Sequence, residues 1–236
     1  LPGEYKVILN STYSFKITNL NNTLRVTNSI NDKMSEIKRD EIWIFGGSWT
    51  YGWGVNNNET YPWLLQEKFK ELKIVNFGVN GYGTIHSIIQ LKEAIKKKNP
   101  RVIILGYVKD HDYRNTFSRI RRKMIYSWNK LGPLTQPYAN FDNNNNLEIF
   151  DAHILYKPFF LQRYSSLSHF LEQKYINYEI RKDRCSEVTK QLIFNMFSIA
   201  QKNNVIFIVL NFWGGQDVIK YAKEKGMYNL DLQLDY

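Results

Sequence analysis

Short, predominantly apolar stretches alternate along this chain with stretches of helical character. A strand buried on both faces needs apolar residues throughout, and such strands occur in parallel sheets that helices cover on both sides. The strand candidates are residues 42–45, 74–77, 102–107, 205–211 and 228–232, and the helix candidates are 61–72, 85–98, 186–203 and 216–225. The pattern predicts an α/β protein in three layers, with a parallel sheet of about five strands.

Two segments fall outside this alternation. Residues 1–40 mix β-prone stretches at 5–9 and 13–17 with Asn and Asp turns, and we expect an N-terminal arm. Residues 112–184 are too long for a strand-to-helix connection. We interpret them as an insertion after the third strand that begins with a helix, passes through an irregular or hairpin segment and ends in a helix over 165–180. The whole chain, 1–236, is then one domain whose insertion forms a lid or substrate wall.

The chain is basic, with 32 Lys and Arg against 22 Asp and Glu, a net charge of +10. Such a charge suits a polyanionic substrate, an anionic membrane surface or nucleic acid. We interpret the basic run RIRRK at 119–123 as a solvated helix face, because no nucleic-acid-binding motif accompanies it. Nucleic acid is therefore not an expected partner, whereas association with a membrane surface stays open. The single cysteine, Cys185, excludes an intrachain disulfide and is expected to be a small buried hydrophobe.

The run FGGSWTYG at residues 45–52 follows the first strand candidate and precedes a helix whose start Thr60 and Pro62 indicate. A serine between glycines at the carboxyl end of a parallel strand stands where α/β sheets place ligands and nucleophiles. The glycines permit a tight turn that would lift the Ser48 hydroxyl toward a substrate. The alternative is a glycine-rich turn in which Ser48 only caps a structure.

Two more polar segments follow the next strand candidates, NFGVNGYGT at 76–84 and GYVKDHDYRN at 106–115. A serine nucleophile, a glycine N–H and a polar side chain on adjacent strand ends are what acyl transfer needs. The serine attacks the carbonyl while the other groups stabilise the oxyanion, at about 3 kcal/mol for each donor.

Over residues 40–115 these runs resemble the SGNH (GDSL-type) hydrolase family in a Gly-Gly-Ser variant, whose members hydrolyse or transfer esters on a flavodoxin-like sheet. The resemblance implies that Ser48 is the nucleophile and that the N–H groups of Ser48 and Gly81 belong to the oxyanion hole. It implies no cofactor, and we expect no metal. The expected partner is a small-molecule or glycan ester, such as an O-acetylated glycan, with Trp49, Trp53 and Tyr82 forming a substrate wall.

The third block departs from the family pattern. The family has an asparagine that donates to the oxyanion, and alignment on Arg114-Asn115 places Asp110 there, with His111 next. An ionised aspartate cannot donate a hydrogen bond, whereas an imidazole N–H can. We therefore expect His111 to replace the asparagine; the alternative is that His111 only orders the loop through Asp110 or Asp112.

The last block is not found. The family's catalytic Asp and His lie three residues apart after the last strand, and neither His86, His153 nor His169 has that position. A serine without a general base is a poor nucleophile, so we expect the chain to be truncated before this block.

The sequence thus predicts a serine esterase or O-acyltransferase that forms an acyl-enzyme on Ser48. The alternatives are a glycan- or lipid-binding pseudoenzyme that lacks the base, and a structural module whose basic surface docks on a membrane or a partner. The sequence leaves the oligomeric state and the compartment open, although an extracytoplasmic or membrane-anchored location is favoured over a cytoplasmic one.

Overall fold

The computed structural model describes residues 1–29, 39–162 and 164–232, and the chain forms two compact units. The first unit comprises Leu1–Tyr82, His86–Lys109 and Phe194–Tyr236, and the second comprises Gly83–Ile85 and Asp110–Ile193. The interval that we interpreted as an insertion, 112–184, falls inside the second unit.

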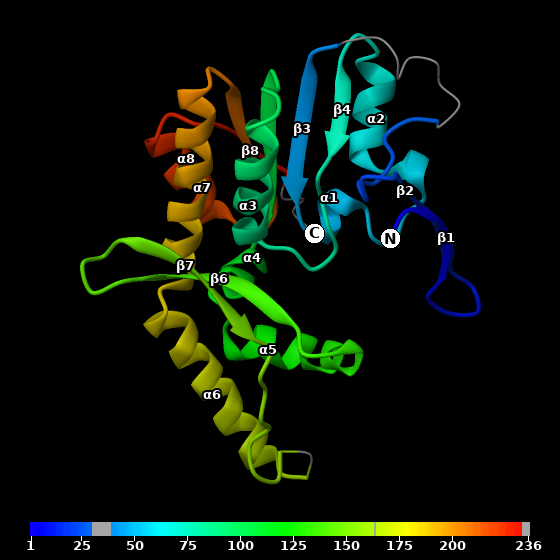
Figure 1. The fold of residues 1–236 in the computed structure, drawn as a ribbon. Coiled ribbons are helices and arrows are strands. Elements are labelled where there is room, and N and C mark those ends of the chain that lie inside the picture. Colours follow the sequence, from blue (N-terminus) through cyan, green and yellow to red (C-terminus); the bar gives the residue numbers. More distant parts are fainter. Residues whose placement is uncertain (30–38, 163, 233–236) are drawn as a thin grey trace. The chain divides into compact units, whose positions relative to one another are not determined.

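A five-stranded parallel sheet occupies the centre of the first unit (Figure 1). Its order is β4-β3-β5-β8-β9, which is the flavodoxin-like order 2-1-3-4-5. The central strands β3 and β5 are buried on both faces, and Ile44, Phe45, Ile103 and Leu105 have no exposed surface. The predicted fold class is therefore confirmed. The strands are β3 (Glu41–Gly46), β4 (Lys73–Asn76), β5 (Val102–Val108), β8 (Ile206–Trp213) and β9 (Tyr228–Asp231).

Helices flank the sheet (Figure 1). As predicted, the Thr60 hydroxyl caps α2, accepting from the Trp63 N–H at 3.4 Å, and Pro62 lies in the first turn. Helix α2 ends earlier than the sequence indicated. The Gln66 side-chain N–H donates to the carbonyls of Phe69 and Leu72, and its oxygen accepts the Ile74 N–H, so these backbone groups bond to a side chain instead of continuing the helix. Within the described part of the chain, no helix is long and apolar enough to span a bilayer. The flanking helices are α2 (Tyr61–Lys68), α3 (Thr84–Ile95), α7 (Cys185–Lys202) and α8 (Gln216–Glu224).

The N-terminal arm begins with an antiparallel hairpin of β1 (Gly3–Ile8) and β2 (Ser14–Asn19). The chain then returns so that Arg25 forms single bridges with Asn19 on one side and with Asn76 of β4 on the other. Phe15, Ile17 and Val26 are buried. The arm therefore covers the outer edge of β4, which would otherwise present unpaired backbone groups.

The second unit contains a hairpin and several helices around a small core of Phe117, Ile125 and Ile154. The expected hairpin is present, and Asp142 turns it by accepting the N–H groups of Asn144 and Asn146. Cys185 is buried as expected, and burial raises the pKa of its thiol to about 12. The elements are α4 (His111–Asn115), α5 (Arg119–Ile125), a 3₁₀ helix (Tyr126–Leu131), β6 (Thr135–Phe141), β7 (Leu147–His153) and α6 (Ser166–Lys182).

The interpretation of residues 119–123 as a solvated helix face is wrong. Arg119 lies 3.0 Å from the carboxylate of Glu172 on α6, Lys123 pairs with the same carboxylate, and Arg122 pairs with Glu179. The Glu172 side chain has no exposed surface. The basic run therefore holds α5 against α6 through ion pairs, because two buried carboxylates require cations beside them.

Replacing Glu172 by Ala is expected to lower the free energy of unfolding by about 3 kcal/mol, because it leaves Arg119 and Lys123 without their counter-charge. The control is Glu187→Ala; Glu187 is 54% exposed and pairs with Arg184, so the loss should stay below about 1 kcal/mol. Urea denaturation measures both, and equal losses would contradict the prediction.

The contribution of Glu172 should also depend on pH. Burial raises the pKa of this carboxyl, but the hydrogen bonds from Lys123 and Tyr156 and the neighbouring cations outweigh burial and lower it. Its stabilisation is therefore complete above the ordinary glutamate pKa of about 4.3 and is lost as the pH falls through the lowered value. Glu172→Gln should reduce this acid-dependent loss in a pH series of denaturation curves.

Candidate active site

Ser48 is the first residue of the short helix α1 (Ser48–Tyr51), two residues after the end of β3. The turn is tight, since the N–H groups of Gly52 and Trp53 both donate to the Ser48 carbonyl, at 2.8 and 2.9 Å. Ser48 itself is half-buried. The structure thus places it on a strand-to-helix turn at the carboxyl edge of the sheet, as the sequence predicts.

The turn that carries Ser48 packs backbone to backbone on its neighbours. A Cβ on Gly78 would lie 2.5 Å from the Tyr51 nitrogen and 2.7 Å from the Thr50 carbonyl carbon. A Cβ on Gly46 would lie 2.8 Å from the Gly106 oxygen. Contacts this short exclude any side chain, so the ends of β3 and β5 and the loop after β4 hold the Ser48 turn in one position.

Asn76, the last residue of β4, ties this turn to the loop that carries Gly81. Its side-chain amide donates to the Thr50 carbonyl at 3.0 Å and accepts the Gly78 N–H at 2.9 Å. The Val79 N–H donates to the Gly46 carbonyl at 3.2 Å. Gly81 follows with a φ of +82°. Ser48 and Gly81 are therefore on hydrogen-bonded backbone segments, and donation from Gly81 to an oxyanion stays a prediction. Asn76 was not among the predicted site residues, although its position within the second motif was a signal.

Thr50, on the buried side of α1, is held by aromatic residues. Its Oγ1 accepts the Tyr61 hydroxyl at 3.0 Å, and burial raises the pKa of Tyr61, which keeps the phenol protonated. Phe212 of β8 contacts the Tyr61 ring at 5.4 Å and stacks on Trp49 at 5.6 Å between centroids. Strand β8 thereby supports α1 as well.

A shallow hollow of about 400 Å³ opens beside the serine and is lined by Ser48, Trp49, Gly52, Trp53 and Val55. Trp49 is 57% exposed and Trp53 is 44% exposed. Of the three aromatic residues predicted to form a substrate wall, these two line the hollow. Tyr82 does not line it, and its ring stacks on His86 at 4.3 Å.

Asp110 and His111 belong to the second unit, where Asp110 precedes α4 and His111 is the first residue of that helix. Asp110 accepts from Arg114 at 3.1 Å. His111 is fully buried, and its Nδ1 lies 3.1 Å from the hydroxyl of Thr84. Because Ser48 belongs to the other unit, an oxyanion role for His111 stays a prediction.

Strand β9 ends at Asp231, at the same edge of the sheet as Ser48, because β3, β5, β8 and β9 are parallel. Asp231 accepts the side-chain amide of Asn211, which is fully buried, at 2.7 Å. The resemblance implies an Asp-x-x-His pair after this strand, and residues 232–236, LQLDY, contain none. Among residues 1–29, 39–162 and 164–232, no three His, Cys, Asp or Glu side chains gather as metal ligands would.

Arg25 of the arm is buried beneath the chain that follows Ser48. Its guanidinium donates to the carbonyls of Tyr51 at 2.7 Å, of Gly52, and of Val55 at 2.7 Å. These carbonyls lie at and after the end of α1, where backbone acceptors lack helical partners and a cation is favourable. Burial lowers the pKa of Arg25, but a guanidinium stays charged. The sequence does not predict the role of Arg25, because nothing in the polar stretch around it distinguishes it from an exposed arginine.

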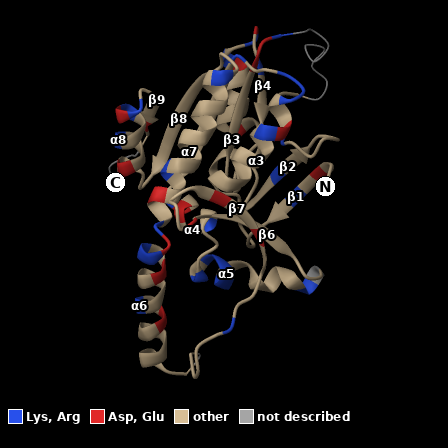
Figure 2. Cartoon of the chain, turned by 60° about the vertical axis from the view of Figure 1, so that its left-hand side comes forward, with Lys and Arg blue, Asp and Glu red and all other residues tan. Residues whose placement is uncertain are grey.

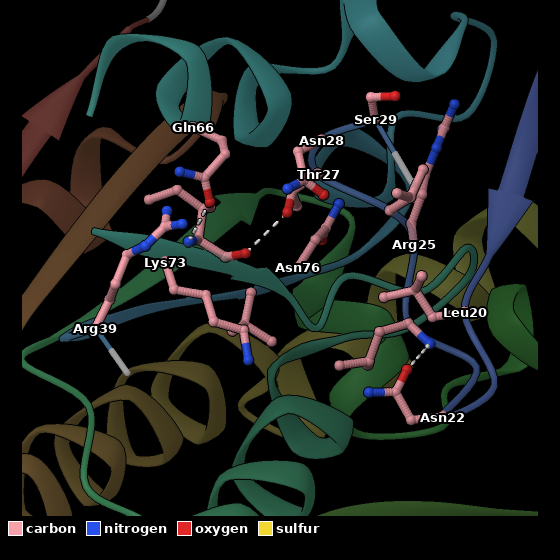
Figure 3. A pocket seen from close by; sticks show the side chains of 14 residues that line it. Leu20, Asn22, Arg25, Thr27, Asn28, Ser29, Arg39, Gln66, Lys73 and Asn76 are labelled. Atoms are coloured by element: carbon pink, nitrogen blue, oxygen red, sulfur yellow. Dashed lines mark hydrogen bonds between the residues drawn. The ribbon is translucent and has the colours of Figure 1, made fainter. Parts of the chain in front are cut away.

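A second cavity, of about 260 Å³, lies between the arm, α2 and β4 (Figure 3). Its polar side chains bind backbone: the Thr27 hydroxyl donates to the Ile74 carbonyl at 2.9 Å, and Gln66 accepts the Ile74 N–H at 2.8 Å. None of the residues predicted for the site lines this cavity.

No family model matches the chain, and no curated protein matches it. Among solved structures, the SGNH-hydrolase family esterase AlinE4 is 11% identical over 82% of this chain and 76% of its own, with a TM-score of 0.43. The psychrotrophic esterase EstA from Pseudoalteromonas sp. is 9% identical over 81% and 76%, with a TM-score of 0.42. A GDSL-like lipase from Bacteroides thetaiotaomicron is 11% identical over 84% and 74%, with a TM-score of 0.40.

The sheet order β4-β3-β5-β8-β9 with helices beside it is the flavodoxin-like arrangement that the sequence predicts. Many of the matching structures carry the description of SGNH or GDSL-type esterases, in agreement with the resemblance inferred from the sequence. With TM-scores below 0.5 and identities this low, these similarities carry no statement about this chain, and its function is argued from the geometry around Ser48.

Replacing Arg25 by Met is expected to lower the free energy of unfolding by about 3 kcal/mol, because three backbone carbonyls lose a charged donor. Arg25→Lys should recover only part of this loss, since a single ammonium nitrogen cannot donate to all three carbonyls as the planar guanidinium does. The control is Arg101→Met, because the Arg101 side chain is 63% exposed and lies 3.6 Å from Asp40. Chemical denaturation that shows no difference between Arg25→Met and Arg101→Met would refute the assignment.

Proposed function

We propose that the chain is a serine-dependent ester hydrolase or O-acyltransferase that acts through an acyl-enzyme on Ser48. The observation that carries the proposal is the turn itself. Ser48 stands at the carboxyl edge of a parallel sheet, and close backbone contacts at Gly46 and Gly78 fix its position beside an open hollow. A nucleophile gains most when it is held in place before the substrate arrives.

In the proposed reaction, Ser48 Oγ attacks the ester carbonyl and gives its proton to a general base. The tetrahedral oxyanion accepts hydrogen bonds from the N–H groups of Ser48 and Gly81, each worth about 3 kcal/mol. The alcohol leaves with the proton, and the acyl group stays on Ser48. Water then attacks the acyl-enzyme in hydrolysis, or a second alcohol attacks it in transfer.

The general base is expected at the edge where β9 ends. Residues that follow β9 leave the sheet at its carboxyl edge, which is also the edge that carries Ser48. The resemblance implies an Asp-x-x-His pair in this place, in which the aspartate would orient the imidazole and the imidazole would take the serine proton. Residues 232–236 contain no histidine, so the residue that acts as the base is not assigned.

We propose an O-acetylated glycan as the substrate class. The hollow beside Ser48 is open and is bordered by two exposed indole rings, Trp49 and Trp53. Such amphipathic surfaces bind ligands that have both apolar faces and polar edges.

Ser48→Ala should reduce kcat/KM for p-nitrophenyl acetate by about a thousandfold or more, because it removes the nucleophile. A fluorophosphonate probe should label the unaltered protein at Ser48, as mapped by mass spectrometry, and should not label the variant. The control is Ser198→Ala, since Ser198 is half-buried on α7 and its hydroxyl bonds the Phe194 carbonyl at 2.9 Å.

Two outcomes count against the proposal. One is hydrolysis that persists in Ser48→Ala. The other is the absence of both turnover and labelling at Ser48. If the protein then still binds an acetylated glycan, the non-catalytic glycan-binding alternative is favoured.

Trp49→Ala and Trp53→Ala should each raise KM for an acetylated glycan about tenfold and change kcat little, because these rings would bind substrate and transition state alike. Trp63→Ala is the control, since Trp63 lies on α2 and does not line the hollow. A fall in kcat with unchanged KM would show that the tryptophans position the serine rather than the substrate.

A further inference from the structure

Helix α6 of the second unit buries charged side chains and exposes large apolar ones. The side that packs on α5 carries the carboxylates of Glu172 and Glu179, both buried, with Ile176 between them. Their cationic partners come from α5, which carries several basic residues (Figure 2). A helix on the surface of a water-soluble unit ordinarily buries its apolar residues and exposes its charges.

Another side of α6 carries large apolar side chains that are exposed. Its large side chains recur at helical spacing, so they form one face, and each is between 44% and 67% exposed. They are Leu167, Phe170, Leu171, Tyr175 and Tyr178. We call this set the α6 outer face.

The loop before α6 extends this surface. Phe160 is 86% exposed, Leu161 is 51% exposed and Tyr164 is 87% exposed. The ring of Phe159 packs edge-on against Tyr175 at 6.0 Å. Loop and helix therefore present aromatic and aliphatic groups together, and a contiguous exposed surface of this kind marks an interaction site.

The charge exposed along this segment is entirely positive among its described residues. Between residues 155 and 182 the acidic residues are Glu172 and Glu179, and both are buried and paired. Lys157, Lys174, Arg181 and Lys182 are exposed. Lys174 lies among these side chains, with its ammonium 5.2 Å from the centre of the Phe170 ring. Aromatic and aliphatic side chains with basic residues among them match the boundary between acyl chains and anionic headgroups.

We propose that the α6 outer face binds the surface of an anionic membrane, with α6 lying in the interface. The apolar and aromatic side chains enter the headgroup boundary, and Lys174, Arg181 and Lys182 contact the acidic headgroups. The ion pairs of Glu172 and Glu179 keep both carboxylates away from the lipid, which would repel them. This binding is independent of the chemistry proposed for Ser48.

The test is co-sedimentation of the whole protein with vesicles of phosphatidylcholine that do or do not contain phosphatidylserine. The protein should bind the phosphatidylserine vesicles, and Ser48→Ala should bind equally well. Phe170→Ser with Leu171→Ser should reduce the partition coefficient at least tenfold. Lys174→Glu with Lys182→Glu should also reduce it more than tenfold, because each basic residue beside an anionic membrane is worth about fivefold.

Matched controls are available in the first unit. Leu64→Ser with Leu230→Ser alters two leucines that are 51% and 53% exposed. Lys220→Glu with Lys223→Glu reverses two exposed charges on α8. Both control variants should keep at least half of the partition coefficient. Circular dichroism should show that all variants fold, since every altered side chain is exposed.

Failure to bind phosphatidylserine vesicles would overturn the proposal, as would binding that Phe170→Ser with Leu171→Ser leaves unchanged. Sedimentation velocity supplies a further check. If the protein self-associates, and the α6 variants abolish this self-association without any vesicle binding, then a second copy of the chain covers the α6 outer face instead of a membrane.

Discussion

The Ser48 turn depends on the direct contact of backbone with backbone. At Gly46 and Gly78 a single added carbon would collide with the turn or with the neighbouring strand end, so β3, the loop after β4 and β5 meet without intervening side chains. Asn76 then supplies hydrogen bonds to both sides of this contact. A serine held in this way would need no rearrangement before the attack that we propose for it, which is the condition under which positioning lowers a barrier.

Buried charge stabilises each unit, in different ways. In the first unit the Arg25 guanidinium is satisfied mainly by backbone carbonyls at the end of α1, so its hydrogen bonds fix the chain that follows Ser48. In the second unit Glu172 is satisfied by cationic side chains, which fixes α6 on α5. The latter arrangement also leaves the apolar side of α6 exposed, so the packing of one helix pair creates the surface that we propose to meet a membrane.

The central strands were predictable because a strand buried on both faces must be largely apolar, and β3, β5 and β8 lie where such runs occur. The turn at Ser48 was predictable because few sequences other than glycine-rich ones permit it. Arg25 was not predictable, since its importance comes from carbonyls that lie 26 to 30 residues away in sequence. The basic run at 119–123 was misjudged for the same reason, because its carboxylate partners lie 49 to 57 residues further along the chain.

The sequence by itself determined the fold class, the strand-to-helix turn of Ser48 and the glycines around it, because local spacing and residue type govern those features. Only the tertiary structure decided which polar groups meet: Asn76 with the Ser48 turn, Arg25 with the end of α1, and Glu172 with the basic run. It also decided which face of α6 is exposed. The physical reason is that a buried charge or amide takes its partners from wherever the fold brings them, and the separation of those partners along the chain leaves no local pattern.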